Sequence, residues 1–146
     1  MVVKIKPLMR GIVLGLVLFG GLYGNIVAHE MGHWLVADEL GRNPQIHLFE
    51  NPENGTRSFF NQNFFTTYTG NAAGVDKADI WIAMAGPAIN LIIALGLVAA
   101  YFMIPKKKKY LRLMVLMLVI PAILSFASNI IPSAGSDGAL IMQNWK

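Results

Sequence analysis

The sequence has no cysteine among its 146 residues, and this absence excludes disulfide bridges and thiolate metal sites. Charged residues are scarce as well: they make up 14% of the chain, whereas soluble domains average about 25%. Hydrophobic residues account for 55% of the composition. A chain of this length forms a single domain, here residues 1–146. The composition indicates that this domain is embedded in lipid.

Acidic residues are too few to balance the basic ones, and the net charge is +4. The basic residues are concentrated in two blocks, Lys4 to Arg10 and Lys106 to Arg112. Basic runs are frequent in proteins that bind nucleic acid. Here both blocks adjoin apolar stretches, which is typical of contact with a membrane surface. We therefore expect the lipid bilayer as a partner, and no nucleic acid.

Long apolar segments predict three transmembrane helices, because a helix needs about 20 apolar residues to cross a bilayer. We expect these helices at about 11–40, 80–104 and 110–131. The stretch between the first two is polar and aromatic, with a Pro/Asn/Gly turn, and it predicts a β-hairpin at about 45–68. The predicted fold class is therefore an all-α integral membrane protein with a small β-hairpin. The tail, 139–146, is expected to be a short helix or a frayed end.

The first predicted helix contains the motif His29-Glu30-Met31-Gly32-His33. Residues four apart lie on one helix face, so the two imidazoles can bind one ion. Glu30 lies beside them, within reach of a metal-bound water. This is the H-E-x-x-H arrangement of two zinc ligands and a general base. A chance match is less favoured, because an ionisable residue at the centre of a membrane helix costs about 2.5–3.5 kcal/mol.

Two other polar residues lie near this motif in the sequence. Asn25 is one turn before His29, where it could orient a ligand or bind substrate. It could equally serve helix packing beside Gly20 and Gly24. His47, in the predicted hairpin, is interpreted as an interfacial residue and not as a ligand.

A catalytic zinc site usually has three protein ligands, so a third is expected. Glu53 has the spacing found in thermolysin-like enzymes, but it lies in a turn sequence and remains an alternative. Asp137 follows the third apolar segment, where Pro132 and Gly135 would break a helix. Broken backbone at membrane depth is tolerated where it is buried or lines a wet cavity. A carboxylate there favours a cation, and Asp137 is the preferred third ligand.

Taken together, these motifs resemble the site-2 protease family of intramembrane zinc metalloproteases. That family combines the HExxH helix with Ala-Gly-Pro-x-x-Asn on a second helix and Asn-x-x-Pro-x-x-x-x-Asp-Gly on a third. The second segment here contains Ala85-Gly86-Pro87-Ala88-Ile89-Asn90. The third carries the family spacing at Asn129, Pro132, Asp137 and Gly138. The three motifs occur in order and span most of the chain.

The resemblance implies a minimal three-helix core of this family, with zinc as cofactor. The implied zinc ligands are His29, His33 and Asp137. Glu30 would be the general base, and Asn90 and Asn129 would line the site and contact substrate or the developing oxyanion. Two departures, Gly135 in place of a frequent Pro and Ala139 in place of a frequent Gly, affect the geometry of the loop.

The expected activity is that of an intramembrane zinc metalloendopeptidase. It would hydrolyse peptide bonds of transmembrane or membrane-adjacent substrate segments by a zinc-activated water, in a prokaryotic cytoplasmic membrane. The predicted hairpin could hold an extended substrate as an added strand, at 46–49 or at 59–68. Two alternatives stay open: a catalytically silent membrane adaptor of the same fold, and a membrane-anchored thermolysin-like peptidase that uses Glu53.

The basic blocks and the family precedent make opposite predictions about orientation. The positive-inside rule places both blocks in the cytoplasm, and with three crossings the HExxH motif then lies near the outer face. Site-2 proteases generally place their site near the cytoplasmic face. The sequence leaves both orientations open.

Overall fold

The fold was analysed in a computed structural model, which describes residues 7–50, 64–70, 76–133 and 136–145. Within these residues the chain forms four helices and two strands. In chain order they are α1 (Pro7–Glu39), β1 (Gln45–Leu48), β2 (Phe64–Thr67), α2 (Lys77–Met103), α3 (Lys109–Ile130) and α4 (Asp137–Asn144). The three predicted long helices are confirmed, and their ends differ from the prediction by about one helical turn or less.

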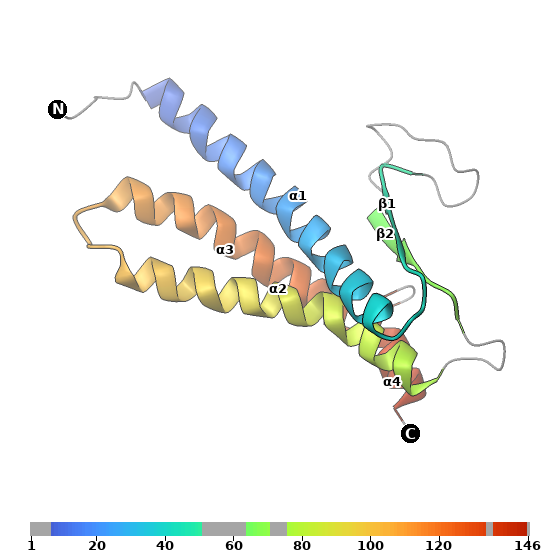
Figure 1. Cartoon of the computed structure of the whole chain (residues 1–146). Helices are drawn as coiled ribbons and strands as arrows, with labels where there is room; N and C mark the ends of the chain where they lie inside the picture. The colour runs from blue at the N-terminus through green and yellow to red at the C-terminus, as the bar shows by residue number, and fades with distance from the viewer. Residues whose placement is uncertain (1–6, 51–63, 71–75, 134–135, 146) are drawn as a thin grey trace.

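Helices α1, α2 and α3 pack together, and all three are long and apolar enough to cross a membrane. In Figure 1, α2 and α3 run antiparallel and α1 lies against them. Their outer surfaces carry large apolar side chains that are more than half exposed, among them Leu16, Ile92, Leu95 and Leu124. Such a surface is the reverse of that of a water-soluble protein, and it suggests a membrane protein.

The contact between α1 and α2 depends on small residues. A Cβ atom added to Gly32 would lie 2.7 Å from the Ala85 carbonyl oxygen and 3.0 Å from the Gly86 Cα. Other small residues close in sequence to Gly32 and Gly86, such as Ala37 in α1 and Ala83 in α2, are also buried. Small side chains let helix backbones approach closely. In lipid the hydrophobic effect does not drive helices together, so such close packing stabilises their association.

The predicted hairpin is confirmed as two antiparallel strands, with Gln45 opposite Thr67 and Leu48 opposite Phe64. The predicted turn sequence, with Glu53, lies outside the described residues. The strands pack on α1, where the Phe64 ring lies 5.8 Å from the Tyr23 ring, centroid to centroid. The hairpin therefore covers α1 along the face that carries the H-E-x-x-H motif.

The molecule has two distinct ends (Figure 1). At one end α1 begins, α2 ends and α3 begins, and the Tyr110 hydroxyl donates to the Arg10 carbonyl across 3.1 Å. We call this the basic end, because Arg10 and the 106–112 block lie there. At the other end are the hairpin, α4 and the C-terminal part of α1.

The other end is organised by a helix cap. Asp76 accepts from the backbone N–H of Asp79, and the Asp79 side chain accepts from the backbone N–H of Asp76, which makes a capping box for α2. The Arg42 guanidinium pairs with Asp76 and so ties the end of α1 to the start of α2. The N–H of Asp79 and the nearby Arg42 lower the pKa of Asp76.

Candidate metal centre

Helix α1 presents His29 and His33 one turn apart on its buried face. Their Nε2 atoms are 3.0 Å apart, and both residues are less than 10% exposed. The two rings meet edge to face, so that both Nε2 atoms point at the same region. The pair is therefore arranged as the i, i+4 spacing predicts.

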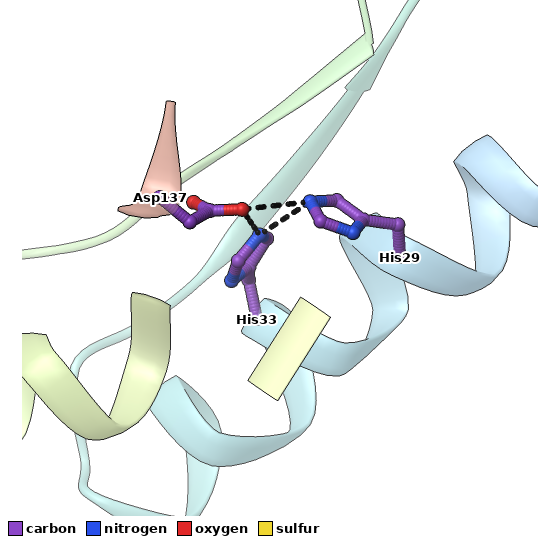
Figure 2. A group of neighbouring side chains, drawn as sticks. All are labelled: His29, His33 and Asp137. Atoms are coloured by element: carbon purple, nitrogen blue, oxygen red, sulfur yellow. Dashed lines mark hydrogen bonds and ion pairs between the residues drawn. The ribbon is translucent and has the colours of Figure 1, made fainter. Parts of the chain in front are cut away.

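Helix α4 brings Asp137 to the two histidines. The Asp137 Oδ2 atom lies 3.0 Å from His29 Nε2 and 3.4 Å from His33 Nε2. Figure 2 shows the carboxylate facing both imidazoles from the opposite side. Ser136 caps α4 by accepting from the backbone N–H of Ala139, and this cap fixes Asp137 as the first residue of the helix.

Gly138 explains why a glycine follows this aspartate. A Cβ atom at Gly138 would lie 2.6 Å from the Ile130 carbonyl carbon, and it would collide with the Ile130 carbonyl oxygen as well. Only glycine lets the start of α4 pack this closely on the end of α3. This close approach carries Asp137 to the histidines.

The tautomer of each imidazole depends on the hydrogen bond that its Nδ1 atom makes, on the side away from Asp137. His33 Nδ1 lies 2.7 Å from the Ile82 carbonyl oxygen. A carbonyl only accepts, so Nδ1 carries the proton and Nε2 of the neutral ring carries a lone pair. His29 Nδ1 likewise has a polar neighbour, the amide of Asn90 at 3.2 Å.

The convergence of these atoms fits a divalent metal. The three ligand atoms of His29, His33 and Asp137 lie within 4.8 Å of one another. Lone pairs and a carboxylate directed at one point repel each other unless a metal ion or a proton lies between them. Two ligand atoms on one tetrahedral zinc are about 3.3–3.5 Å apart, because each is about 2.0–2.1 Å from the ion. The separations of 3.0–3.4 Å are close to that value.

Asn90 lies beside His29 and is completely buried. Its Nδ2 atom is 2.6 Å from the Ser125 hydroxyl oxygen and 3.2 Å from His29 Nδ1, while its Oδ1 atom has no hydrogen-bond partner among the described residues. A flip of the amide places Oδ1 where it accepts from His29 Nδ1–H. That is the bond that fixes the tautomer of a zinc-binding histidine.

Gly86 allows α2 to lie against both imidazoles. A Cβ atom there would be 2.6 Å from His33 Cε1 and 2.7 Å from His29 Cε1. Any side chain would therefore push the ligands apart. The sequence singled out this glycine only as a member of the family motif, and the pattern gave no sign of contact with the histidines.

Glu30 is also buried, and its carboxylate is held by a residue that the sequence analysis missed. The Thr66 hydroxyl lies 2.8 Å from Glu30 Oε2 and 3.0 Å from the Glu30 backbone oxygen, so it can donate to either. Thr66 is in β2, on the same strand face as Phe64. The hairpin thus reaches the predicted general base directly.

A cavity of about 260 Å³ opens beside the cluster. His29, Glu30, His33 and Asp137 line it, together with Phe64, Phe65, Thr66 and Tyr68. Asn129 lines it too, and its Nδ2 atom donates to the Ser125 carbonyl across 2.8 Å. The site residues from α1, α3 and α4 therefore share one cavity, and β2 forms a wall of it.

Two of the residues named in the sequence analysis, Asn25 and His47, lie outside this cavity. The Asn25 amide donates to the Gly21 carbonyl across 2.7 Å, and Asn25 lines a separate cavity with Gly20 and Gly24. This is the packing role that the sequence left open for Asn25. His47 pairs with Glu50 and contacts Thr67 within the hairpin, away from the metal cluster.

Two titratable groups that line this cavity, Tyr68 and Asp137, lie outside the long helices. Charge and burial shift the pKa values of both. Burial raises the pKa of the Asp137 carboxyl, but hydrogen bonds and charge from imidazoles protonated at Nε2 outweigh burial when they face it, and the net shift is downward. Asp137 is thus ionised at neutral pH, as a metal ligand must be. Burial raises the pKa of the Tyr68 phenol, and nearby carboxylates act in the same direction. Tyr68 therefore stays neutral on the cavity wall.

Comparison with known proteins gave no relative. No protein-family model, no curated protein and no solved structure matches this chain. The functional argument therefore depends on the chain's own residues.

Proposed function

We propose that this protein is an intramembrane zinc metalloendopeptidase that hydrolyses transmembrane or membrane-adjacent peptide segments. The observation that carries the proposal is the meeting of His29, His33 and Asp137, which come from opposite parts of the chain. The H-E-x-x-H motif alone would supply two ligands. The third, with Glu30 on the same cavity wall, makes a complete candidate zinc peptidase site.

Each polar group in the site has a task in this proposal. Zinc at the three ligands would polarise the scissile carbonyl and activate water. Glu30 takes a proton from the attacking water and transfers it to the leaving amine, so one peptide bond becomes a carboxylate and an amine. Thr66 holds the Glu30 carboxylate in place through Oε2. Asn129 lines the cavity wall, and in this proposal its amide contacts the substrate.

The apolar helices and the cavity support a substrate that comes from the membrane. The cavity is lined by residues near one end of three helices that are each long enough to span a bilayer. Strand β2 lines it, so an extended peptide could lie alongside the hairpin while its carbonyl faces the metal ligands. This arrangement supports the predicted added strand, which stays a prediction.

Zinc content tests the ligand set first. We would measure zinc per chain in the detergent-purified full chain, in Asp137→Ala and in Glu30→Gln. We expect one zinc in the unsubstituted protein, loss in Asp137→Ala and retention in Glu30→Gln. The matched control is Asp38→Ala, because Asp38 is an exposed carboxylate at the same end of α1 and should not affect zinc.

Cleavage of a labelled transmembrane peptide tests the reaction. We expect Glu30→Gln to lower turnover by about 10²–10⁴-fold, the usual contribution of a general base. Full zinc retention in Asp137→Ala would contradict the ligand set and would direct the search to Glu53. Absence of zinc from the unsubstituted protein would favour the silent adaptor instead.

A further inference from the structure

A second cavity lies at the basic end, far from the metal cluster. It has a volume of about 380 Å³ and is lined by Tyr101, Lys106, Lys109, Arg112, Leu113 and Leu116. Half of these residues are cations, and none of the described lining residues is acidic. The other half form an apolar wall that continues down the helices.

Arg112 is held in place within this cavity. Its guanidinium carbon lies 4.2 Å from the centroid of the Tyr101 ring, which is a cation–π contact between α3 and α2. Its Nε atom is buried and has no hydrogen-bond acceptor within the described part of the chain. The guanidinium therefore stacks on Tyr101, while its Nε–H finds no acceptor among the described residues.

The start of α3 adds a positive field in the same place. Lys108 is the N-cap, its side chain makes no capping bond, and the first turn of α3 contains no acidic residue. Lysines at a helix N-terminus oppose the helix dipole, whose positive end lies there. An anion bound at this point would satisfy the free backbone N–H groups and relieve the repulsion among the cations.

The apolar side of the cavity indicates which anion would fit. Leu113 and Leu116 lie beneath the cations along α3, and the neighbouring Phe102 and Met103 expose most of their side chains. A free inorganic ion would leave this apolar wall unused. A molecule with a phosphate at one end and hydrocarbon at the other would contact both parts.

We propose that this cavity binds the phosphate of an anionic phospholipid at the membrane surface. Lys106, Lys109 and Arg112 pair with the phosphate, while an acyl chain lies along Leu113 and Leu116. The proposal does not depend on the metal centre. Either one can fail without the other.

Two neighbouring lysines allow a matched test. Lys109 lines the cavity, whereas Lys107, in the same basic run, does not. We would reconstitute the full chain with phosphatidylglycerol or with phosphatidylcholine of the same acyl chains, and measure bound lipid by native mass spectrometry. The variants are Lys109→Gln, Arg112→Gln and Lys107→Gln, with Lys77→Gln as the same charge change at the other end of the molecule.

We expect retained phosphatidylglycerol on the unsubstituted chain and a roughly fivefold or larger loss of affinity in Lys109→Gln and Arg112→Gln. Lys107→Gln and Lys77→Gln should retain most of the binding. Lys109→Gln keeps the test decisive if Arg112→Gln fails to fold, because Lys109 is exposed.

Three results would overturn the proposal. Equal loss in Lys107→Gln and Lys109→Gln would mean diffuse attraction to a charged surface. Equal retention of phosphatidylcholine would mean that the headgroup charge is not recognised. Inorganic phosphate that binds as tightly as the lipid, or displaces it at equal concentration, would make this a site for a soluble anion.

Discussion

The two ends of the molecule use charge in opposite ways. At the site end, ionisable groups are buried and meet groups of opposite or complementary character, as His29 and Asp137 do. At the basic end, charges of one sign gather around an open cavity. The difference teaches that helix packing alone fixes the buried His–Asp cluster. The cations around the cavity at the basic end need an anion from outside the protein to balance them. Binding should therefore depend on geometry at one end and on charge at the other.

The largest effect should come from Gly86, which tests whether geometry governs the site end. In Gly86→Ala the new Cβ would lie within 2.7 Å of both imidazoles, so we expect loss of zinc and of peptidase activity. The control is Gly96→Ala in the same helix, because a Cβ there meets nothing within 4 Å. Zinc analysis of both purified variants gives the answer. Normal zinc in Gly86→Ala would show that α2 does not lie against the ligands.

Asn90 should have the next largest effect, because its amide contacts His29 from behind. In Asn90→Leu the imidazole loses its hydrogen-bond partner, and we expect zinc affinity to fall by about 10–100-fold. Competition with a calibrated chelator measures the affinity. An unchanged affinity would mean that Asn90 only packs the helices. Asn25→Leu is the control, since Asn25 lies in a separate cavity.

Thr66 should have a smaller effect, on turnover and not on zinc. Thr66→Val keeps the shape of the side chain but removes the hydroxyl that reaches Glu30, and we expect kcat to fall roughly tenfold. Thr66→Ser keeps the hydroxyl and should restore most of the rate. Peptide cleavage and zinc content would be measured on the same preparations. Equal rates for the valine and serine variants would remove Thr66 from the mechanism.

Salt should produce the smallest effect, and it separates the two ends most directly. Raising ionic strength from about 0.1 to about 1 M shortens the Debye length from about 10 to about 3 Å. We expect lipid binding at the basic end to weaken several-fold, while zinc content stays constant because its ligands are buried. Zinc loss that parallels lipid loss would break the comparison between the two ends.

The helices and the hairpin could be predicted because their signals are local. An apolar stretch of sufficient length defines a spanning helix, and α2, predicted at about 80–104, is observed at Lys77–Met103. The tail was predicted as a short helix or a frayed end from residue 139, and α4 begins at Asp137, where Ser136 caps it.

The metal ligands could be proposed from the sequence, but their surroundings could not. His29 and His33 follow from helix periodicity, and Asp137 from a carboxylate beside a helix break. The contacts of Gly86 and Thr66 depend on how separate segments pack in space. A single sequence carries no local signal for such contacts. The resemblance implies that Asn90 contacts the substrate or the developing oxyanion, and the structure adds a contact between its amide and His29.

Orientation follows from the same two ends. Arg10 and the block 106–112 share one end, and the residues of the His–His–Asp cluster lie toward the opposite ends of α1, α2 and α3. The positive-inside rule therefore still predicts a site near the outer face, opposite to the location that the resemblance to site-2 proteases implies. Reporter fusions after residue 54 and after residue 146 distinguish the two orientations.

The placement of Asp137 in α4 has a consequence for biosynthesis. The ribosome makes the two histidines early, and it makes the third ligand only after α2 and α3 have been completed. A nascent chain therefore carries two of the three proposed ligands and no complete site. If the proposed peptidase activity needs all three, the order of the ligands along the chain delays that activity until folding is nearly finished.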